Sequence, residues 1–87
     1  MVAIHYSKSF LKGVKQLPVS QQRLLAKKLS LLQHNPFDSR LHTKQLSTPL
    51  QGVFSFRISR DYRVLFHFQD ASTVIVLRAK HRKEVYR

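Results

Sequence analysis

The sequence contains no cysteine and only four acidic residues, Asp38, Asp61, Asp70 and Glu84. Without cysteine there is no disulfide framework and no thiolate chemistry. A paired-carboxylate site, or a Mg²⁺ site with two or three acidic ligands, would need nearly all four acids. The five histidines include no pair at the i, i+4 spacing, so the sequence gives no zinc motif. We therefore expect a protein that works without a metal and without a cofactor.

Long apolar runs are also missing. The first ten residues, MVAIHYSKSF, hold no apolar stretch long enough for a signal peptide. No window approaches the run of about 20 apolar residues that a membrane span needs. The 87 residues are 43% hydrophobic, which is too apolar for a disordered chain and short enough for one domain, residues 1–87. We expect a single cytoplasmic domain with no membrane contact.

What the chain has in excess is positive charge. Sixteen Lys and Arg residues face the four acids, which gives a net charge of +12. A charge of this size loosens a compact chain by self-repulsion unless an anionic partner relieves it. The composition therefore predicts binding to nucleic acid, to an acidic protein, or to both.

The first third of the chain reads as a strand followed by a helix. Residues 2–6 alternate weakly, as a short strand does. Ser7 is a suitable N-cap for a helix that Pro18 ends. Its apolar side is marked at helical spacing by Phe10, Val14 and Leu17. Gly13 is expected to weaken this helix by roughly 1 kcal/mol relative to Ala.

A second helix should follow after a very short connection. We expect Ser20 to cap it, with Val19 and Leu24 as a hydrophobic staple. Its apolar stripe consists of Leu25, Leu29 and Leu32, flanked by Leu24 and Leu31. The helix should end near His34, because the residue before Pro36 disfavours helical backbone. The short connection predicts an antiparallel helix hairpin.

Residues 37–51 read as a loop of mixed polarity. Leu41, Leu46 and Leu50 are expected to anchor this loop on the core. His42 and Lys44 can reach a basic surface from here.

Three strands are expected in the last third, at residues 53–58, 62–68 and 73–79. Short turns between them predict an antiparallel meander. Alternation separates Phe54, Phe56 and Ile58 from Ser55 and Arg57 in the first of these strands. In the third, it separates Ile75 and Leu77 from Val74, Val76, Arg78 and Lys80. The expected fold is α+β, with an N-terminal strand and a helix hairpin packed on an antiparallel meander.

Each of these strands offers a basic residue to the face opposite the core. These residues are Arg57, Arg63, and either Arg78 or Lys80. The basic tail, which includes His81, Arg82, Lys83 and Tyr86, should lie nearby. A sheet with one cationic face is suited to binding a polyanion. The simpler alternative is that Arg57 and Arg63 are ordinary solvated sheet residues, since one face of an antiparallel sheet is often wet.

Three segments carry a family resemblance: FSFRIS at 54–59, DYRVLF at 61–66 and KHRKEVYR at 80–87. In this order, behind a strand and a basic helix hairpin, they resemble the RelE/ParE toxin superfamily of bacterial toxin–antitoxin modules. The resemblance covers nearly the whole chain. It implies the RelE-like fold, a cognate antitoxin and, for the RelE branch, a metal-independent endoribonuclease that cuts mRNA in the ribosomal A site.

The resemblance also assigns residues. It implies that Arg57, Arg63 and Tyr86 match basic and tyrosine positions of the family's site. Lys80 lies near a catalytic arginine position, and His81 and Arg82 are neighbours that can take that role. Ser55 stands where the family often has a lysine. The expected catalytic set is Arg57, Arg63, Lys80, His81 and Tyr86, and the expected RNA-binding set is Arg78, Arg82, Lys83, His42 and Lys44.

The implied chemistry fits the composition. RNA cleavage by the substrate's own 2′-OH needs a base, an acid for the leaving 5′-oxygen, and cations for the charged phosphorane. Arg57 and Arg63 suit the last task, because a guanidinium meets a phosphate with two hydrogen bonds. Lys80, His81 and Tyr86 are candidates for proton transfer, and Tyr86 can also stack on a base. The sequence does not decide which of them is the base.

Two other functions fit the same fold or charge. One is a ParE-like, non-enzymatic inhibitor of DNA gyrase. The other is a non-catalytic RNA-binding module with a steep salt dependence. If the protein is a toxin, whether a nuclease or a gyrase inhibitor, we expect an acidic or amphipathic antitoxin segment that wraps the basic surface.

Overall fold

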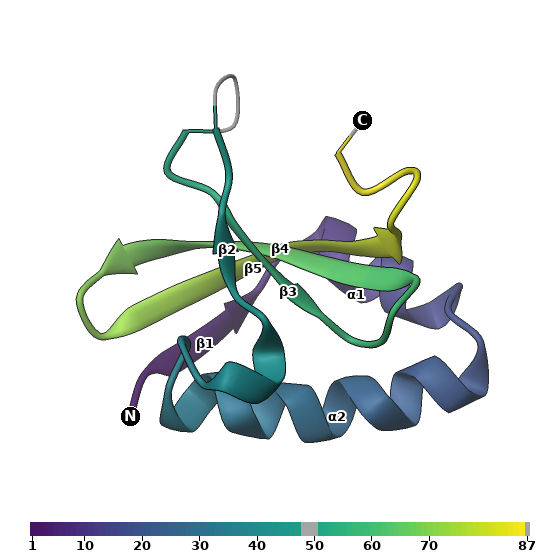
Figure 1. Ribbon diagram of the computed structural model, residues 1–87, viewed down its shortest axis with the longest axis horizontal. Helices are drawn as coiled ribbons and strands as arrows, with labels where there is room; N and C mark the ends of the chain where they lie inside the picture. Colours follow the sequence, from purple (N-terminus) through teal and green to yellow (C-terminus); the bar gives the residue numbers. More distant parts are fainter. Residues whose placement is uncertain (48–50, 87) are drawn as a thin grey trace.

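The protein is a five-stranded mixed sheet with two helices, the longer of which crosses one face of the sheet (Figure 1). The computed structural model describes residues 1–47 and 51–86. Its elements, in chain order, are β1 (Ala3–Tyr6), α1 (Lys8–Lys15), α2 (Val19–His34), the 3-10 turn η1 (Ser39–Leu41), β2 (Lys44–Gln45), β3 (Phe54–Arg57), β4 (Tyr62–Asp70) and β5 (Thr73–His81). The strands lie in the order β1-β5-β4-β3-β2. The predicted α+β fold is confirmed.

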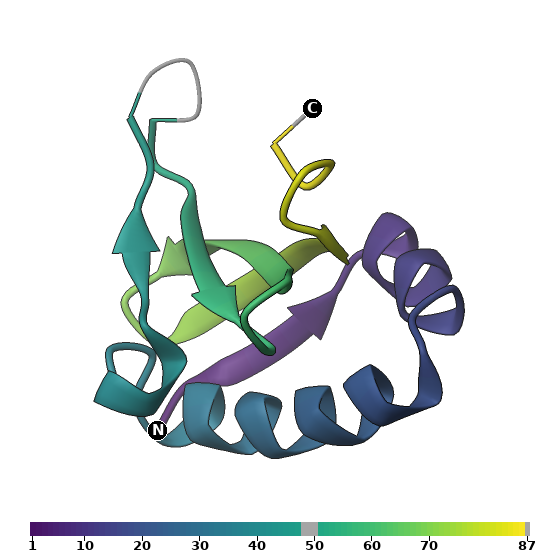
Figure 2. The same cartoon turned by 45° about the vertical axis from the view of Figure 1, so that its right-hand side comes forward.

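One pairing makes the sheet mixed. β1 runs parallel to β5, whereas β2, β3, β4 and β5 pair antiparallel with their neighbours. Figure 2 shows α2 running beneath the sheet and the C-terminal segment on its opposite side. We call the face away from α2 the open face. The main core lies on the helical side, where Phe10 and Leu32 of the helices meet Phe56 and Phe66 of the sheet, all 2% exposed or less.

Helix α1 begins where the sequence predicts, but it ends at Lys15 with Gln16 as C-cap, so Leu17 lies beyond the helix. Ser7 is its N-cap, and the Ser7 hydroxyl accepts a hydrogen bond of 3.0 Å from the Phe10 backbone N–H. Gly13, which costs helix propensity, lies against β5. A Cβ at Gly13 would stand 2.8 Å from the backbone oxygen of Ala79. Close packing of α1 on β5 therefore requires this glycine.

Helix α2 starts at Val19, two residues earlier than a Ser20 cap requires, so that prediction is wrong. Pro18 occupies the N-cap position, and its carbonyl accepts from the N–H groups of Gln21 and Gln22 at 2.9 and 3.1 Å. The fixed φ of proline favours this geometry, which leaves Ser20 inside the first turn. The predicted leucine stripe does face the core, with Leu25 and Leu32 buried.

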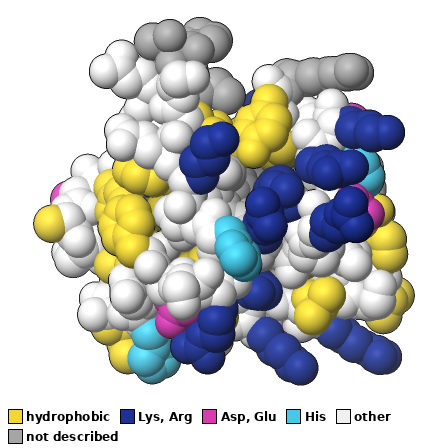
Figure 3. Space-filling view, viewed as in Figure 1, with side chains coloured by type: hydrophobic (Ala, Val, Ile, Leu, Met, Phe, Trp, Pro, Cys, Tyr) yellow, Lys and Arg dark blue, Asp and Glu magenta, His cyan; other side chains and the backbone are white. Residues whose placement is uncertain are grey.

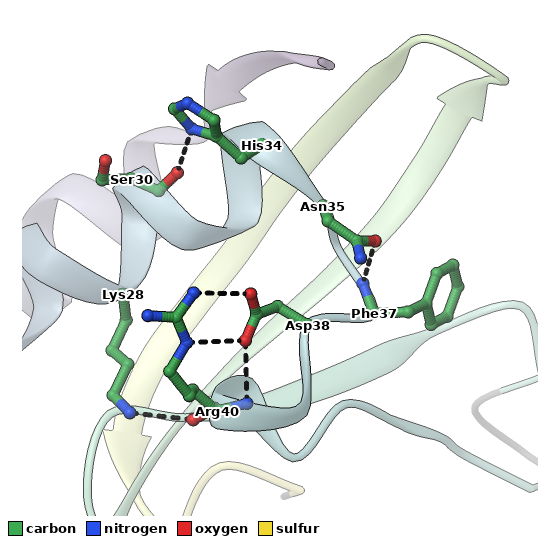
Figure 4. A network of polar contacts seen from close by, with 7 residues as sticks. All are labelled: Lys28, Ser30, His34, Asn35, Phe37, Asp38 and Arg40. Atoms are coloured by element: carbon green, nitrogen blue, oxygen red, sulfur yellow. Dashed lines mark hydrogen bonds and ion pairs between the residues drawn. The ribbon is translucent and has the colours of Figure 1, made fainter.

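The segment expected to be a loop contains two short elements, η1 and β2. Asp38 caps η1 by accepting from the Arg40 N–H, and its carboxylate also pairs with the Arg40 side chain at 2.9 Å (Figure 4). These contacts lower the pKa of Asp38 to about 2, so the pair stays charged at neutral pH. Leu41 is fully buried and Leu46 half-buried, as expected, while Leu50 lies outside the described residues.

A β-bulge in β5 changes which residues face the core. Leu65 lies opposite Arg78, but the next residue, Phe66, lies opposite Val76, so Leu77 has no partner on β4. Strict alternation had put Val74 and Val76 on the side of Arg78 and Lys80. The structure instead buries Val74 and Val76 completely and leaves Lys80 exposed on the open face. An extra residue at a bulge shifts the alternation of all later side chains, and this shift is not visible in the sequence pattern.

No helix of the described chain is long and apolar enough to cross a bilayer.

Candidate nucleic-acid interface

Three cations form one row across the open face. Arg57 lies directly opposite Arg63 on the β3–β4 ladder, and Arg63 lies directly opposite Lys80 on the β4–β5 ladder. Residues opposite each other on neighbouring strands have Cβ atoms about 5 Å apart. Figure 3 shows Lys and Arg side chains gathered on one half of the molecule, with few acidic side chains among them. We call Arg57, Arg63 and Lys80 the cationic row.

Arg63 is the best fixed member of the row. Its Nη1 donates to the backbone oxygens of Ser59 and Arg60 at 2.8 and 2.7 Å, which ties it to the β3–β4 turn. Burial lowers the pKa of the Arg63 guanidinium, and the charge of Arg57 lowers it further, while a hydrogen bond to Tyr86 opposes this shift. The Arg63 side chain is thus half-buried and is oriented by the carbonyls of the β3–β4 turn. It is repelled by the neighbouring charge of Arg57.

A second cross-strand row lies beside the first. Lys44, Ser55, Leu65 and Arg78 face one another in this order across β2 to β5. Ser55 is 3% exposed, and Lys44 lies directly opposite it. Ser55 is therefore a buried serine, and the cation nearest to it in the sheet pairing is Lys44 on the adjacent strand.

The C-terminal segment folds back over the open face. Val85 is fully buried although it lies among charged residues, and it accepts through its carbonyl oxygen from Arg78 Nη1 at 3.5 Å. The Glu84 and Val85 N–H groups donate to the His81 carbonyl at 2.8 and 3.0 Å. This turn brings Tyr86, which is 45% exposed, to Arg63.

Val85 was not recognised in the sequence. Its signal was weak: Val85 is the one aliphatic residue in KHRKEVYR, and a single apolar residue is often exposed.

A cleft of about 460 Å³ opens between this segment and the sheet. Its apolar lining includes Leu65, Leu77 and Val85. Its polar lining includes Ser7 and Ser9 from the start of α1, beside Arg78 and Tyr86. An apolar cleft beside cations and an aromatic ring is suited to a nucleobase whose phosphate meets the row.

The structure does not bring the remaining predicted residues into the row. His81 lies on the other side of β5, where its ring meets Tyr62 edge-on at 5.3 Å and its Nδ1 accepts from the Lys83 N–H. His42 ends η1 beside α2 with a positive φ of 51°. Arg82 pairs with Asp61 at 3.5 Å. Lys83 is exposed on the C-terminal turn.

Asp61 and Glu84 are the acidic residues of the β3–β4 turn and the C-terminal segment, and Asp61 pairs with Arg82. Among residues 1–47 and 51–86, no three His, Cys, Asp or Glu side chains come together as metal ligands. The chemistry that the open face offers comes from guanidinium, ammonium and phenol groups.

Comparison with known proteins gives the family. The model of the family described as "Phage derived protein Gp49-like (DUF891)" matches residues 12–87. The chain belongs to this Gp49-like family. The family is one of RelE-like toxins, so the resemblance to the RelE/ParE superfamily is confirmed. No curated protein matches the Gp49-like chain.

Solved toxins share its fold over their whole length. A copper-bound mutant toxin from Helicobacter pylori is 20% identical with a TM-score of 0.81, and covers 98% of this chain and 99% of its own. YafQ from Escherichia coli is 19% identical with a TM-score of 0.77 and full coverage of both chains. The toxin–antitoxin complex RelBE2 from Mycobacterium tuberculosis is 29% identical with a TM-score of 0.70, and covers 93% of this chain and 98% of the matched chain.

Proposed function

We propose that this protein is the toxin of a type II toxin–antitoxin module and cleaves mRNA on the ribosome without a metal ion. The cationic row carries this proposal. It holds two guanidinium groups and an ammonium group on adjacent strands, with Tyr86 linked to the central Arg63. An inhibitor that acts by binding alone does not need three cations aligned across one sheet face.

The side chains divide the chemistry between them. The 2′-OH attacks the adjacent phosphorus, the P–O5′ bond breaks, and a 2′,3′-cyclic phosphate and a 5′-OH result. Arg57 and Arg63 stabilise the negative charge of the phosphorane, which is where preorganised donors contribute most. Lys80 and Tyr86 are the proton-transfer candidates that lie on the open face. A role for His81 stays a prediction, since its ring lies on the other side of β5.

The expected partner is an acidic, amphipathic segment of a cognate antitoxin. The solved RelBE2 relative is itself a toxin–antitoxin complex. On the helical side, an apolar groove of about 350 Å³ runs between α1 and α2 and includes Tyr6 and Leu11, which are about half exposed. Exposed basic residues lie on the same helices, among them Lys12, Lys15, Arg23 and Lys27. An amphipathic helix with acidic flanks would complement both features.

The test is a brief induction in bacterial cells, followed by mapping of mRNA 5′ ends and measurement of plasmid supercoiling. Wild type should produce new 5′ ends at codon-phased positions, and Tyr86→Ala should not. Phe37→Ala is the matched control, because Phe37 is a similarly exposed ring that packs on Phe54 and Phe68 away from the row. It should cut as wild type does.

Other outcomes would replace the proposal. Intact mRNA with altered supercoiling would indicate a gyrase inhibitor. Intact mRNA with normal supercoiling would leave a non-catalytic binding surface. Cuts that persist in Tyr86→Ala would keep the nuclease and remove Tyr86 from its site.

A further inference from the structure

Ser7 joins three parts of the fold at one point. Its hydroxyl accepts from the Phe10 N–H at 3.0 Å, which caps α1. The same hydroxyl donates to the Leu77 carbonyl oxygen at 2.8 Å. The Ser7 backbone N–H donates to the Val76 carbonyl at 3.1 Å. Ser7 therefore bonds to Val76, which is paired on one side of the β4–β5 register shift, and to Leu77, the bulged residue without a partner on β4.

This register shift decides which residue faces Arg63. Beyond the bulge, Arg63 lies opposite Lys80 and Leu65 opposite Arg78. If the register of the Phe66–Val76 pair continued without the bulge, Arg63 would lie opposite Ala79. A slip of one residue moves every following side chain to the other face. Lys80 would then leave the cationic row for the helical side.

We propose that Ser7 is a positioning residue for the cleavage site, because it fixes the bulge that turns Arg78 and Lys80 onto the open face. The inference rests on the proposed nuclease function. Ser7 lines the cleft beside the open face, and in the proposed role it acts through its hydrogen bond to the Leu77 carbonyl of β5. The hydrogen bond that the Ser7 hydroxyl donates to Leu77 carries this role. Capping of α1 requires only that the hydroxyl accept from the Phe10 N–H.

Three substitutions separate these two roles. Ser7→Asp keeps an acceptor for the Phe10 N–H but has no proton to donate to Leu77, because an ionised carboxylate only accepts. Ser7→Ala removes both bonds. Ser7→Thr keeps both. Ser9→Asp is the charge control, because Ser9 lines the same cleft as Ser7 and the substitution adds the same carboxylate there while the Ser7–Leu77 bond stays intact.

The first measurement is the single-turnover rate of mRNA cleavage on programmed ribosomes, together with the ribosome concentration that gives half-maximal rate. Misplacement of a catalytic group by about 1 Å can cost about 100-fold in rate. We therefore expect the maximal rate of Ser7→Asp and Ser7→Ala to fall by about tenfold to 100-fold, with less change in half-saturation. Ser7→Thr should stay near wild type, and Ser9→Asp should fall less than Ser7→Asp.

The second measurement does not depend on activity. Amide hydrogen exchange in Ser7→Asp should accelerate around Leu77 to Lys80, while Phe10 and the rest of α1 stay protected by the retained cap. In Ser7→Ala both regions should exchange faster.

Three results would overturn the role of Ser7. They are a wild-type rate in Ser7→Asp, an equal loss in Ser7→Asp and Ser9→Asp, and a Ser7→Thr variant as slow as Ser7→Ala. If wild type itself cuts no mRNA, the proposed function fails. The exchange experiment then still decides whether Ser7 holds the bulge.

Discussion

Arg57 and Arg63 face each other across two strands, yet their structural roles differ. Arg57 is exposed and is the charged neighbour that lowers the pKa of the Arg63 guanidinium. Arg63 donates two hydrogen bonds to the carbonyls of the turn that precedes β4. Loss of activity on mutation of Arg63 therefore mixes chemistry with folding, whereas loss at Arg57 does not.

Substitution of the two arginines should change the free energy of unfolding by different amounts. Arg63→Ala loses two hydrogen bonds to the turn and one to Tyr86, each worth about 1 kcal/mol. It also relieves a like-charge pair worth up to about 1 kcal/mol, so we expect a net loss of about 2 kcal/mol. Arg57→Ala only relieves the repulsion, so its free energy of unfolding should stay within about 0.5 kcal/mol or rise. Urea unfolding followed by circular dichroism measures both. Equal losses would show that the turn contacts of Arg63 contribute nothing.

At the scale of the element, α1 and the residue that caps it make two close contacts with β5. Ser7 holds the bulge of β5, and Gly13 packs where a side chain would meet the Ala79 oxygen. Together they place the end of β5, and with it Lys80 and the C-terminal segment, relative to β4. An apparently weak helix is thus part of what builds the open face.

Gly13→Ala tests this fit, because helix propensity and packing predict opposite signs. Propensity alone would stabilise α1 by about 1 kcal/mol. Overpacking against a backbone atom costs about 1–3 kcal/mol and should win, because Ala79 is held in the ladder with Val64. We expect a net loss of about 1–2 kcal/mol, seen as a lower midpoint of thermal unfolding.

Ala26→Gly serves as the reference, since it changes propensity at an exposed position of α2. A stabilised Gly13→Ala variant would mean that α1 can move away from β5 at little cost.

At the scale of the whole molecule, the net charge of +12 is divided between two sides of the sheet. The open face carries the cationic row and Lys44, while the helical side carries lysines around an apolar groove. In the proposed function, the first binds RNA and the second binds the antitoxin. The two assignments predict different responses to salt.

Binding to a 2′-O-methyl RNA, which lacks the attacking hydroxyl, should weaken steeply as KCl rises. Each lost phosphate contact to a single strand reduces the slope of log K against log salt by about 0.7. Arg57→Gln and Lys80→Gln should each reduce the slope by about this amount. Lys27→Gln, which removes an exposed charge from α2, should leave the slope as it is. Fluorescence anisotropy at several KCl concentrations measures these slopes, and equal slopes for all variants would mean diffuse binding over the whole surface.

Local patterns were sufficient for most of the fold. The N-cap at Ser7, the leucine stripe of α2 and the three C-terminal strands follow from propensity, periodicity and turn residues, which act over a few neighbours. The same patterns missed β2, because two residues carry no alternation and this strand exists only through its pairing with β3. They also placed the start of α2 at Ser20, because Pro18 as a cap has no side-chain signal.

The sequence by itself determined the chemical character of the protein: strongly cationic, poor in carboxylates, with arginines on alternating positions of neighbouring strands. Only the tertiary structure decided which cations meet. The bulge at Leu77 brought Lys80 opposite Arg63, and the burial of Val85 brought Tyr86 to the same place. The physical reason is that register and chain reversal depend on contacts between residues far apart in sequence. Ser7 and Leu77 are one such pair, separated by 70 positions and joined by one hydrogen bond.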